Sequence, residues 1–312
     1  MANHVLDIDD LTLDEFNKVI SYGISPNPQK VMADKSAALL FEKPSARTRH
    51  STETAIVALG GHPVTVKGDE VGIGKRESVH DLALTLACYH SVIGARVFDH
   101  KVLKEMTRAI DEAGANCSVL NLLSNKAHPC QGLADIMTII QESNEMNLDI
   151  GKVKVAYVGD SNNVVSSLAL SCAMAGVKLV VASPPGFQPE DELIKRVERL
   201  GGTIEIVVDP FEAVEGADFI YTDTWTSMGQ EAEASVRKEV FRNYQVNDLL
   251  VKRAKSDVKI MHCLPAHRGE EITDSVIDSK SSIVFKQAYN RKLSAIGLLT
   301  HLVKAQGGQI WP

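Results

Sequence analysis

The hydrophobic pattern of the chain alternates between short apolar runs and longer amphipathic stretches, with turn residues between them. Apolar runs such as Val153–Val158 are typical of strands that are buried on both faces. The longer stretches, such as Val102–Ala113, repeat their apolar positions with the period of a helix. Strands that alternate with helices predict parallel sheets covered by helices, which is an α/β fold.

The first half of the chain is expected to contain four strands and four helices. The strands are predicted at Ala37–Phe41, Pro63–Val66, Ser91–Val97 and Cys117–Leu122. The helices are predicted at Arg47–Leu59, Ser78–Tyr89, Val102–Ala113 and Gly132–Glu142. The segment Ser143–Lys152 is polar and shows no clear period, so we place a domain boundary there. The first predicted domain therefore spans residues 1–145.

The second half, residues 146–312, restarts the alternation and predicts a second doubly wound parallel sheet. Its strands are expected at Val153–Val158, Val177–Ala182, Thr203–Val208, Phe219–Thr222 and Val258–Cys263. Its helices are expected at Val164–Ala175, Glu190–Leu200 and Lys292–Ala305. We expect the last helix, about residues 292–305, to return to the first domain and pack on it.

Composition and charge narrow the classes of function. The 312 residues suggest two domains, and 44% hydrophobic with 23% charged residues is ordinary for a globular chain. The net charge of -7 argues against nucleic acid or an anionic membrane as a partner. No apolar run approaches the roughly 20 residues of a membrane-spanning helix. The start, MANHVLDIDD, lacks the basic and apolar regions of a signal peptide, so the cytoplasm is the expected compartment.

The cysteines do not indicate a disulfide framework or a metal site. Their number is odd and no C-x-x-C pair occurs among Cys88, Cys117, Cys130, Cys172 and Cys263. A zinc site built from His262, Cys263 and His267 is disfavoured, because adjacent His and Cys rarely reach one metal ion. A cysteine nucleophile with a distant base such as His128 stays open as an alternative.

The sharpest local feature is the sequence FEKPSARTR, between the first predicted strand and the first predicted helix. Ser45 is a good N-cap, which places Ala46, Arg47 and Thr48 in the first helical turn. Free N–H groups, two hydroxyls and a guanidinium there would suit a phosphate. Arg47 and Arg49 oppose the helix dipole, and a bound anion would offset that cost. The alternative is a capped helix with solvated arginines.

Other candidate residues follow strands of the first half. In open parallel sheets, ligands gather at the carboxyl edge, where Arg96 and the segment from His128 to Gln131 are expected. His128 can donate a hydrogen bond to a carbonyl oxygen, and Gln131 can do the same. Arg291 is expected in the first turn of the last helix, either as a third arginine for the anion or as a surface charge.

The second half places polar and acidic residues at the corresponding edge. Asn162 and Asn163 follow a strand where a dinucleotide fingerprint would begin, but G-x-G-x-x-G is absent, so NAD binding is disfavoured. Their amides suit a small polar ligand such as an amino acid. Asp223 and Ser227 follow the next strand, and Cys263 ends the last one. A cationic first half and a polar, acidic second half fit transfer between a phosphorylated donor and an amino acid.

Four motifs resemble those of the carbamoyltransferase family. The sequence SARTR at 45–49 is similar to the family's S-T-R-T-R, and HPCQ at 128–131 is similar to H-P-x-Q. The patterns D-x-x-x-S-M-G at 223–229 and HCLP at 262–265 resemble the ornithine branch of the family. The motifs occur in the family's order between positions 41 and 291, so the resemblance covers nearly the whole chain.

The resemblance implies that a carbamoyl group passes from carbamoyl phosphate to L-ornithine, without a metal ion or an organic cofactor. It implies catalytic roles for Arg47, Arg96, His128 and Cys263. It implies contacts with carbamoyl phosphate for Ser45, Ala46, Arg47, Thr48, Arg96, His128, Gln131, Cys263, Leu264 and Arg291. It implies contacts with ornithine for Asn163, Asp223, Ser227 and Met228. It also implies a homotrimer with sites between subunits.

The chain departs from the family pattern at two positions. Ala46 stands where Thr or Gly is usual, which removes one possible hydroxyl contact, and Gly72 stands where Gln is usual. In trimeric relatives the loop around Gly72 reaches the site of an adjacent subunit. The alternatives are transfer to acetylornithine, putrescine or aspartate, or a homologue that binds these ligands without catalysis.

Overall fold

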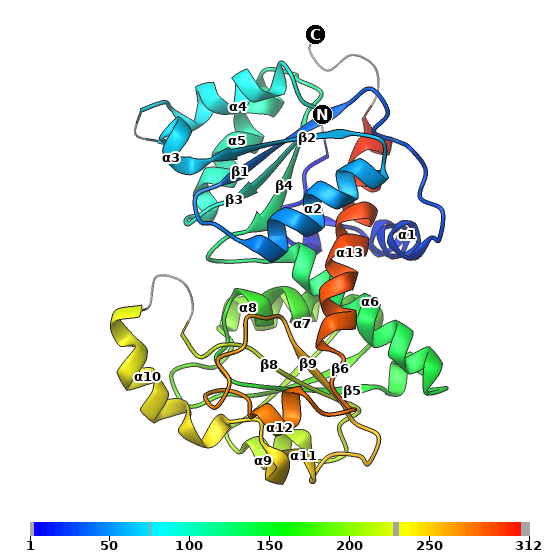
Figure 1. Cartoon of the computed structure of the whole chain (residues 1–312), viewed down its shortest axis with the longest axis vertical. Coiled ribbons are helices and arrows are strands. Elements are labelled where there is room, and N and C mark those ends of the chain that lie inside the picture. Colours follow the sequence, from blue (N-terminus) through cyan, green and yellow to red (C-terminus); the bar gives the residue numbers. More distant parts are fainter. Residues whose placement is uncertain (1–2, 75, 227–230, 307–312) are drawn as a thin grey trace. The chain divides into compact units, whose positions relative to one another are not determined.

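The computed structural model describes residues 3–74, 76–226 and 231–306, and its chain divides into two compact units (Figure 1). Unit 1 contains the chain up to Ala134 and again from Tyr289, and unit 2 contains Asp135–Ala288. The divisions fall inside two helices, α6 (Pro129–Glu145) and α13 (Val284–Ala305). The sequence predicts the domain boundary at 143–152. The first division of the chain into units falls earlier, inside α6, so one continuous helix carries the chain from the first unit to the second.

The sheet of unit 1 has four parallel strands in the order β2-β1-β3-β4. These are β1 (Ser36–Phe41), β2 (His62–Lys67), β3 (Val92–Arg96) and β4 (Ser118–Leu123). The helices of this unit, besides parts of α6 and α13, are α1 (Leu13–Ile24), α2 (Ala46–Ala58), α3 (Gly68–Val71), α4 (Val79–Ala87) and α5 (His100–Glu112). Helices α4 and α5 pack on one face of the sheet, and α2 lies on the other (Figure 1).

The sheet of unit 2 has five parallel strands in the order β7-β6-β5-β8-β9. These are β5 (Lys154–Val158), β6 (Lys178–Ala182), β7 (Ile204–Val207), β8 (Phe219–Thr222) and β9 (Lys259–His262). The helices that lie wholly in this unit are α7 (Asn163–Ala175), α8 (Asp191–Arg199), α9 (Pro210–Val214), α10 (Ala234–Phe241), α11 (Asp248–Val251) and α12 (Asp274–Ile277). Short 3-10 turns occur at η1 (Ile8–Asp10), η2 (Ile150–Lys152), η3 (Glu231–Glu233) and η4 (Arg242–Tyr244).

The predicted fold class is confirmed, because both sheets are parallel and helices cover both of their faces (Figure 1). Strands such as β1, β3 and β5 are almost entirely buried, which explains their continuous apolar sequences. In each sheet the strand order reverses beside the first strand of the unit, as in other doubly wound folds. The carboxyl ends of the strands therefore form one edge in each unit.

Helix α13 begins at Val284, well before the predicted start at Lys292. Its first turns invert the usual pattern of burial, which hid them from the sequence analysis. Phe285 and Tyr289 are 76% and 60% exposed, whereas the polar Gln287 and Asn290 are buried. From Tyr289 onward α13 belongs to unit 1. No helix in the described part of the chain combines the length and the apolar character needed to span a membrane.

Helix α1 was not predicted, although its start carries a clear signal. Thr12 Oγ1 accepts a hydrogen bond from the N–H of Glu15, and the Glu15 carboxylate accepts one from the N–H of Thr12 at 2.9 Å. This reciprocal pair is a capping box, which two residues of the sequence were enough to indicate. Val19 and Ile20 then form part of the buried face of the helix.

Candidate active site

The segment from Ser45 to Thr48, which the sequence analysis expects to bind phosphate, lies at the start of α2. Ser45 is the N-cap, with an extended backbone, and its Oγ accepts a hydrogen bond from Thr48 N at 3.3 Å. Ala46 and Arg47 are the first two residues of the helix, exposed and half-buried respectively. The N–H groups of a first helical turn have no carbonyl partner within the helix, so they are suited to an anion.

The hydroxyl oxygen of Thr48 is the centre of a cluster of hydrogen-bond donors. Arg291 Nη2 lies 2.9 Å from it, Ser45 Oγ lies 3.1 Å from it, and Arg96 Nη1 lies 3.3 Å from it. A hydroxyl oxygen offers two lone pairs. Three donors therefore converge on one neutral acceptor in a place where Thr48 itself is only 1% exposed. A phosphate group, with several charged oxygens, would satisfy these donors far better.

Three guanidinium groups lie close enough to affect one another. Arg96 is the last residue of β3 and Arg291 lies inside α13, and both are buried. Burial, and then the positive charges of Arg291 and Arg47, lower the pKa of Arg96 to about 10. Arg96 is therefore still charged at neutral pH. Buried like charges are unfavourable unless an anion compensates them, so this cluster indicates an anion site.

Two sequence expectations about arginines are corrected by the structure. Arg291 was expected in the first turn of the last helix, with a surface charge as the alternative, but it is 4% exposed and inside α13. Its Nη1 donates to Gln131 Oε1 at 2.7 Å. Arg49 was grouped with the anion-binding arginines, but it is exposed and its Nε donates to Glu53 Oε1 at 2.9 Å. The helix turns Arg49 away from the cluster because it follows Thr48 by about 100°.

His128, which directly precedes α6, is held in its neutral form. It is 3% exposed. Burial, and then the positive charges of Arg291, Arg96 and Arg47, keep the pKa of His128 well below its usual range. A neutral imidazole carries one N–H, so His128 can donate a hydrogen bond without adding charge to the cluster. Gln131 of α6 follows His128 by three residues and is also buried.

In unit 2, the carboxylate of Asp223 organises the second set of candidate residues. Asp223 follows β8 and is 7% exposed. Its Oδ2 accepts a hydrogen bond from Asn162 Nδ2 at 2.9 Å, and its Oδ1 accepts from Thr224 N at 2.8 Å. Asn162 is the N-cap of α7, whereas Asn163 is the first residue of that helix and is half-buried. Asn162 therefore has a structural task, and Asn163 is the residue of this pair that the sequence analysis expects to contact ornithine.

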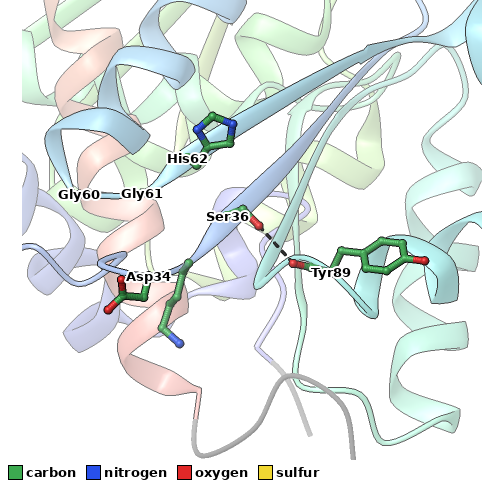
Figure 2. Close-up of a pocket in the computed structure, with 7 residues that line it drawn as sticks. Asp34, Ser36, Gly60, Gly61, His62 and Tyr89 are labelled. Atoms are coloured by element: carbon green, nitrogen blue, oxygen red, sulfur yellow. Dashed lines mark hydrogen bonds between the residues drawn. The ribbon is translucent and has the colours of Figure 1, made fainter.

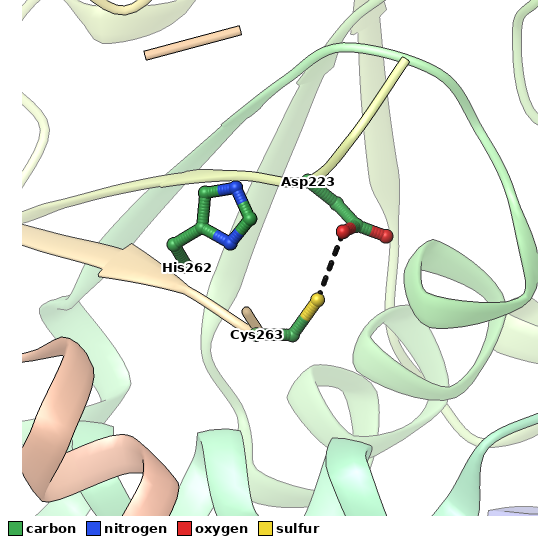
Figure 3. A group of neighbouring side chains, drawn as sticks. All are labelled: Asp223, His262 and Cys263. Atoms are coloured by element: carbon green, nitrogen blue, oxygen red, sulfur yellow. Dashed lines mark hydrogen bonds between the residues drawn. The ribbon is translucent and has the colours of Figure 1, made fainter. Parts of the chain in front are cut away.

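Cys263, directly after β9, donates to Asp223 Oδ1 with an Sγ–oxygen distance of 2.9 Å (Figure 3). The adjacent His262 is fully buried, and both of its ring nitrogens are engaged. Its Nε2 lies 2.9 Å from Glu271 Oε1, and its Nδ1 accepts from Leu264 N at 2.8 Å. Cys263 is therefore paired with a carboxylate, not with a neighbouring imidazole.

Two groups of potential metal ligands occur in the described residues, and side chains in both groups already form hydrogen bonds or ion pairs. The ligand atoms of Asp223, His262 and Cys263 lie within 4.8 Å of one another, but His262 has no lone pair left for a metal ion. In the second group, His267, Glu270 and Glu271, the last residue accepts from His262 and from His267 N. Lys238 Nζ lies 2.6 Å from Glu270 Oε1. These contacts argue against the zinc interpretation.

The backbone at Leu264 is held in an unusual conformation. Its φ angle is +58°, and the bond to Pro265 is cis. The N–H of Leu264 donates to His262 Nδ1, which fixes this turn directly beside Cys263.

Ser227 and Met228, the other two residues expected to bind ornithine, lie outside the described residues.

Arg237 is a residue of this region that the sequence analysis missed. It is buried and forms an ion pair with Asp160, and its Nε donates to Trp225 O at 2.6 Å. Burial raises the pKa of Asp160 to about 6, although the charge of Arg237 opposes this shift. Arg237 thus joins the loop after β5 to the loop after β8. Its local sequence on α10 carried no signal of this role.

Gly72, one of the departures from the family pattern, has a structural reason. It caps α3 with a left-handed backbone, with φ at +62°. A Cβ atom at this position would lie 2.8 Å from Cβ of Arg76. A residue with a side chain would therefore be strained in this turn.

A hollow of about 400 Å³ in unit 1 lies away from these residues (Figure 2). Its lining includes Ser36 at the start of β1, His62 at the start of β2, and Tyr89. It therefore opens at the amino ends of the strands. The arginine cluster lies at the carboxyl end, where Arg96 ends β3. In parallel sheets the carboxyl edge is the usual place for ligands, so this hollow is not the anion site.

The fold and the donor cluster define an α/β protein with an anion site at the edge of a parallel sheet. Comparison with known proteins agrees. Residues 3–141 match the model of the aspartate/ornithine carbamoyltransferase carbamoyl-P binding domain. Residues 151–302 match the model of the Asp/Orn binding domain of the same family. The chain therefore belongs to the aspartate/ornithine carbamoyltransferase family.

Individual relatives are similar over nearly their whole length. The chain is 42% identical over 307 residues to the ornithine carbamoyltransferase of Archaeoglobus fulgidus, covering 96% of this chain and 97% of that one. It is 46% identical over 268 residues to the anabolic ornithine carbamoyltransferase of Pyrococcus furiosus, covering 85% and 82%. The solved structure of the P. furiosus enzyme matches with a TM-score of 0.88 at 41% identity, covering 96% of both chains. The Thermus thermophilus enzyme matches with a TM-score of 0.86 at 36% identity, covering 97% and 99%.

Proposed function

We propose that the chain is an ornithine carbamoyltransferase, which converts carbamoyl phosphate and L-ornithine into L-citrulline and phosphate. The observation that carries this proposal is the convergence of Arg96, Arg291 and Ser45 on the single oxygen of Thr48. Such an excess of buried donors suits a phosphorylated substrate. The relatives named above, which are ornithine carbamoyltransferases, support the same conclusion.

In unit 1, the phosphate group of the substrate is proposed to bind at the start of α2. Ser45, Thr48 and the N–H groups of Ala46 and Arg47 bind its oxygens, with Arg291 supplying further charge. Ala46 lacks a side-chain hydroxyl, but its N–H remains at the helix end where it can donate. The departure at this position therefore removes a single hydrogen bond and leaves the principal charged groups in place.

The carbamoyl group is then oriented by Arg47, Arg96, His128 and Gln131. Its carbonyl oxygen gains negative charge when an amine attacks the carbon. Arg96 as a cation and His128 as a neutral donor stabilise that charge, and buried donors do so more strongly than water does. Phosphate leaves as the C–O bond breaks, so the transfer needs no further activation of the donor.

In unit 2, the proposal gives ornithine to the residues around Asp223. The carboxylate of Asp223, with Ser227, binds the α-ammonium group, and Asn163 with the backbone of Met228 binds the α-carboxylate. The attacking side-chain amine must be neutral, which costs about 4 to 5 kcal/mol at neutral pH for a reference pKa of about 10.4. Cys263 lies beside this amine and positions it or takes part in proton transfer, without covalent attack.

An assay of citrulline formation tests the proposal. The purified protein should form citrulline from carbamoyl phosphate and ornithine, and much more slowly carbamoylate acetylornithine, putrescine or aspartate. Transfer to one of these amines in preference to ornithine would replace the proposed specificity. Binding of both ligands in a calorimeter without any product would indicate a non-catalytic homologue.

The anabolic name of the P. furiosus relative supports a place for this chain in arginine biosynthesis. The homotrimer and the cytoplasmic compartment stay predictions. A homotrimer would have three times the 33.9 kDa mass of the chain in light scattering.

A further inference from the structure

A buried carboxylate in unit 2, that of Asp135, is linked by hydrogen bonds to the two strands that carry Asp223 and Cys263. Asp135, on α6, is 0% exposed and accepts hydrogen bonds from two different elements. Tyr221 of β8 donates its phenolic hydrogen to Asp135 Oδ2 at 3.0 Å. Gln287 of α13 donates from Nε2 to Asp135 Oδ1 at 2.7 Å. Both of these partners are also completely buried.

Each partner of Asp135 leads along the chain to one residue of the candidate site. Tyr221 stands two positions before Asp223, at the carboxyl end of β8. Gln287 uses its other amide atom, Oε1, to accept from the backbone N–H of His262 at 2.9 Å. His262 ends β9 and directly precedes Cys263.

The contact between Cys263 and Asp223 closes these links into a ring (Figure 3). Starting at Asp135, the ring passes through Tyr221 to Asp223, crosses to Cys263, and returns through His262 and Gln287. Strands β8 and β9 are already paired within it, with Thr222 opposite His262. The ends of both strands are thus linked by hydrogen bonds to one carboxylate, directly through Tyr221 and by way of Gln287.

In this ring, the side chain at position 135 accepts two hydrogen bonds, one from Tyr221 and one from Gln287. The N–H of His262 fixes the orientation of the Gln287 amide, so that Nε2 must face Asp135. Burial, and next to it the charge of Asp135, keep the pKa of Tyr221 well above its usual range, so its hydroxyl remains a donor. A carboxylate accepts from both donors as they stand, whereas an asparagine would accept from Gln287 only if its NH2 group faced Tyr221 and the phenolic oxygen became the acceptor.

We propose that Asp135 and Gln287 are positioning residues that set the Asp223–Cys263 contact and thereby the fit of the amine substrate. This rests on the proposed function of Asp223 and Cys263. Neither Asp135 nor Gln287 touches the substrate in this scheme. They act through the strand ends that carry the two residues which do.

Exchanging the two side chains provides a direct test. Gln287→Glu alone leaves a carboxylate oxygen facing the Asp135 carboxylate, so that two acceptors meet at neutral pH. In the double variant Asp135→Asn with Gln287→Glu, the introduced asparagine accepts from Tyr221 through its amide oxygen and donates through its NH2 group to the introduced glutamate. That glutamate still accepts from the N–H of His262 with its other oxygen. Every hydrogen bond of the ring is restored, and the negative charge moves from position 135 to position 287.

Asp218→Asn is the matched control. Asp218 is as deeply buried in the same unit, and its carboxylate likewise accepts twice, from Lys154 N at 2.9 Å and from Lys255 Nζ at 2.6 Å. It lies before β8, at the opposite end of that strand from Asp223. A general loss of stability would therefore appear in this variant as well, without a change at the site.

We expect Gln287→Glu to lower kcat/KM for ornithine by about 10- to 100-fold, because small displacements of positioned groups have effects of this size. The KM for carbamoyl phosphate should change less, since all of its expected contacts except Cys263 and Leu264 belong to unit 1. The double variant should recover most of the loss, and Asp218→Asn should show none of it. If Gln287→Glu does not fold, Gln287→Met, which removes the amide at similar length, serves as the single variant.

The proposal would be overturned if the single variants kept the wild-type kcat/KM for ornithine, or if the double variant were no better than Gln287→Glu. Crystal structures of the same variants give a readout that does not depend on the substrate. The Cys263 Sγ to Asp223 Oδ1 distance should lengthen beyond 2.9 Å in the single variant and return in the double variant. If the wild type formed no citrulline, the proposed function would fail and this distance would still decide the positioning role.

Discussion

Arg291 and Thr48 are 243 residues apart in the chain, yet Arg291 Nη2 donates to Thr48 Oγ1 at 2.9 Å in the buried interior of unit 1. The same guanidinium donates through Nη1 to Gln131 Oε1 at 2.7 Å. One side chain thus joins α2, α6 and α13. It brings a further positive charge to the start of α2 from a residue far along the chain.

Replacing Arg291 by lysine should separate charge from geometry. A lysine keeps the positive charge, but its single ammonium group cannot reproduce the planar fork that reaches Thr48 and Gln131 together. We expect the Kd for carbamoyl phosphate, measured by calorimetry, to rise by about 10- to 100-fold, equivalent to the 1.5–3 kcal/mol of a charged hydrogen bond. Arg49→Lys is the control, because Arg49 is exposed. Unchanged affinity in Arg291→Lys would contradict the anion site.

Thr48→Val should weaken the folded protein and make it more dependent on phosphate. Valine has nearly the shape of threonine but removes the oxygen on which Arg291 Nη2, Arg96 Nη1 and Ser45 Oγ converge. Losing a buried acceptor costs about 1–3 kcal/mol. We expect a lower melting temperature that inorganic phosphate raises by more than it raises that of the wild type. Equal stabilisation of both proteins would place the anion elsewhere.

The neutral state of His128 predicts a pH dependence of stability. Its folded-state pKa lies well below the usual value, because of burial and then the charges of Arg291, Arg96 and Arg47. Between that lowered pKa and about pH 6.5, the unfolded chain binds a proton that the folded chain does not, so stability falls as the pH drops through this window. The effect reaches about 1.4 kcal/mol per pH unit.

His128→Gln should therefore lose less stability than the wild type between pH 7.5 and pH 5.5. Denaturant midpoints at the two pH values measure this difference. His50→Gln, at an exposed histidine of α2, should behave like the wild type. An identical pH response in His128→Gln would mean that His128 takes up its proton equally well in the folded and the unfolded protein.

Cys263→Ser tests whether the thiol acts as a nucleophile. A serine hydroxyl can still donate to Asp223 Oδ1, so a positioning role survives in part, whereas a covalent role would be lost. We expect kcat to fall by about 10-fold, which is less than the roughly 100-fold or more that loss of a general acid–base group costs, and we expect a larger fall in Cys263→Ala. Complete inactivity of the serine variant, with a carbamoylated wild-type thiol in mass spectra, would require a covalent mechanism.

Local physics made several features of this protein predictable. The apolar runs of β1, β3 and β5 indicated buried parallel strands, because such strands need apolar side chains on both faces. Ser45 was recognisable as an N-cap, because an N-cap depends only on a side chain and the next three residues. Arg96 was expected at the end of its strand and is found there.

Features that depend on distant contacts were missed. Arg291 was misplaced because the exposed Phe285 and Tyr289 disguise the first turns of α13. Arg237 gave no sign of its pairing with Asp160, which lies in another element. The Asp135–Gln287 contact joins residues 152 positions apart, and no spacing along the chain reveals it.

The sequence alone determined the parallel α/β architecture and the capped start of α2, and it predicted the residue types that would contact carbamoyl phosphate and ornithine. These follow from periodicity and from capping, which act within a few residues. Only the tertiary structure decided that Arg96 and Arg291 meet at Thr48, that His128 is neutral and that Cys263 pairs with Asp223. Each of these depends on burial and on side chains brought together by packing. Hydrogen bonds and charge interactions depend on distance in space and not on distance along the chain.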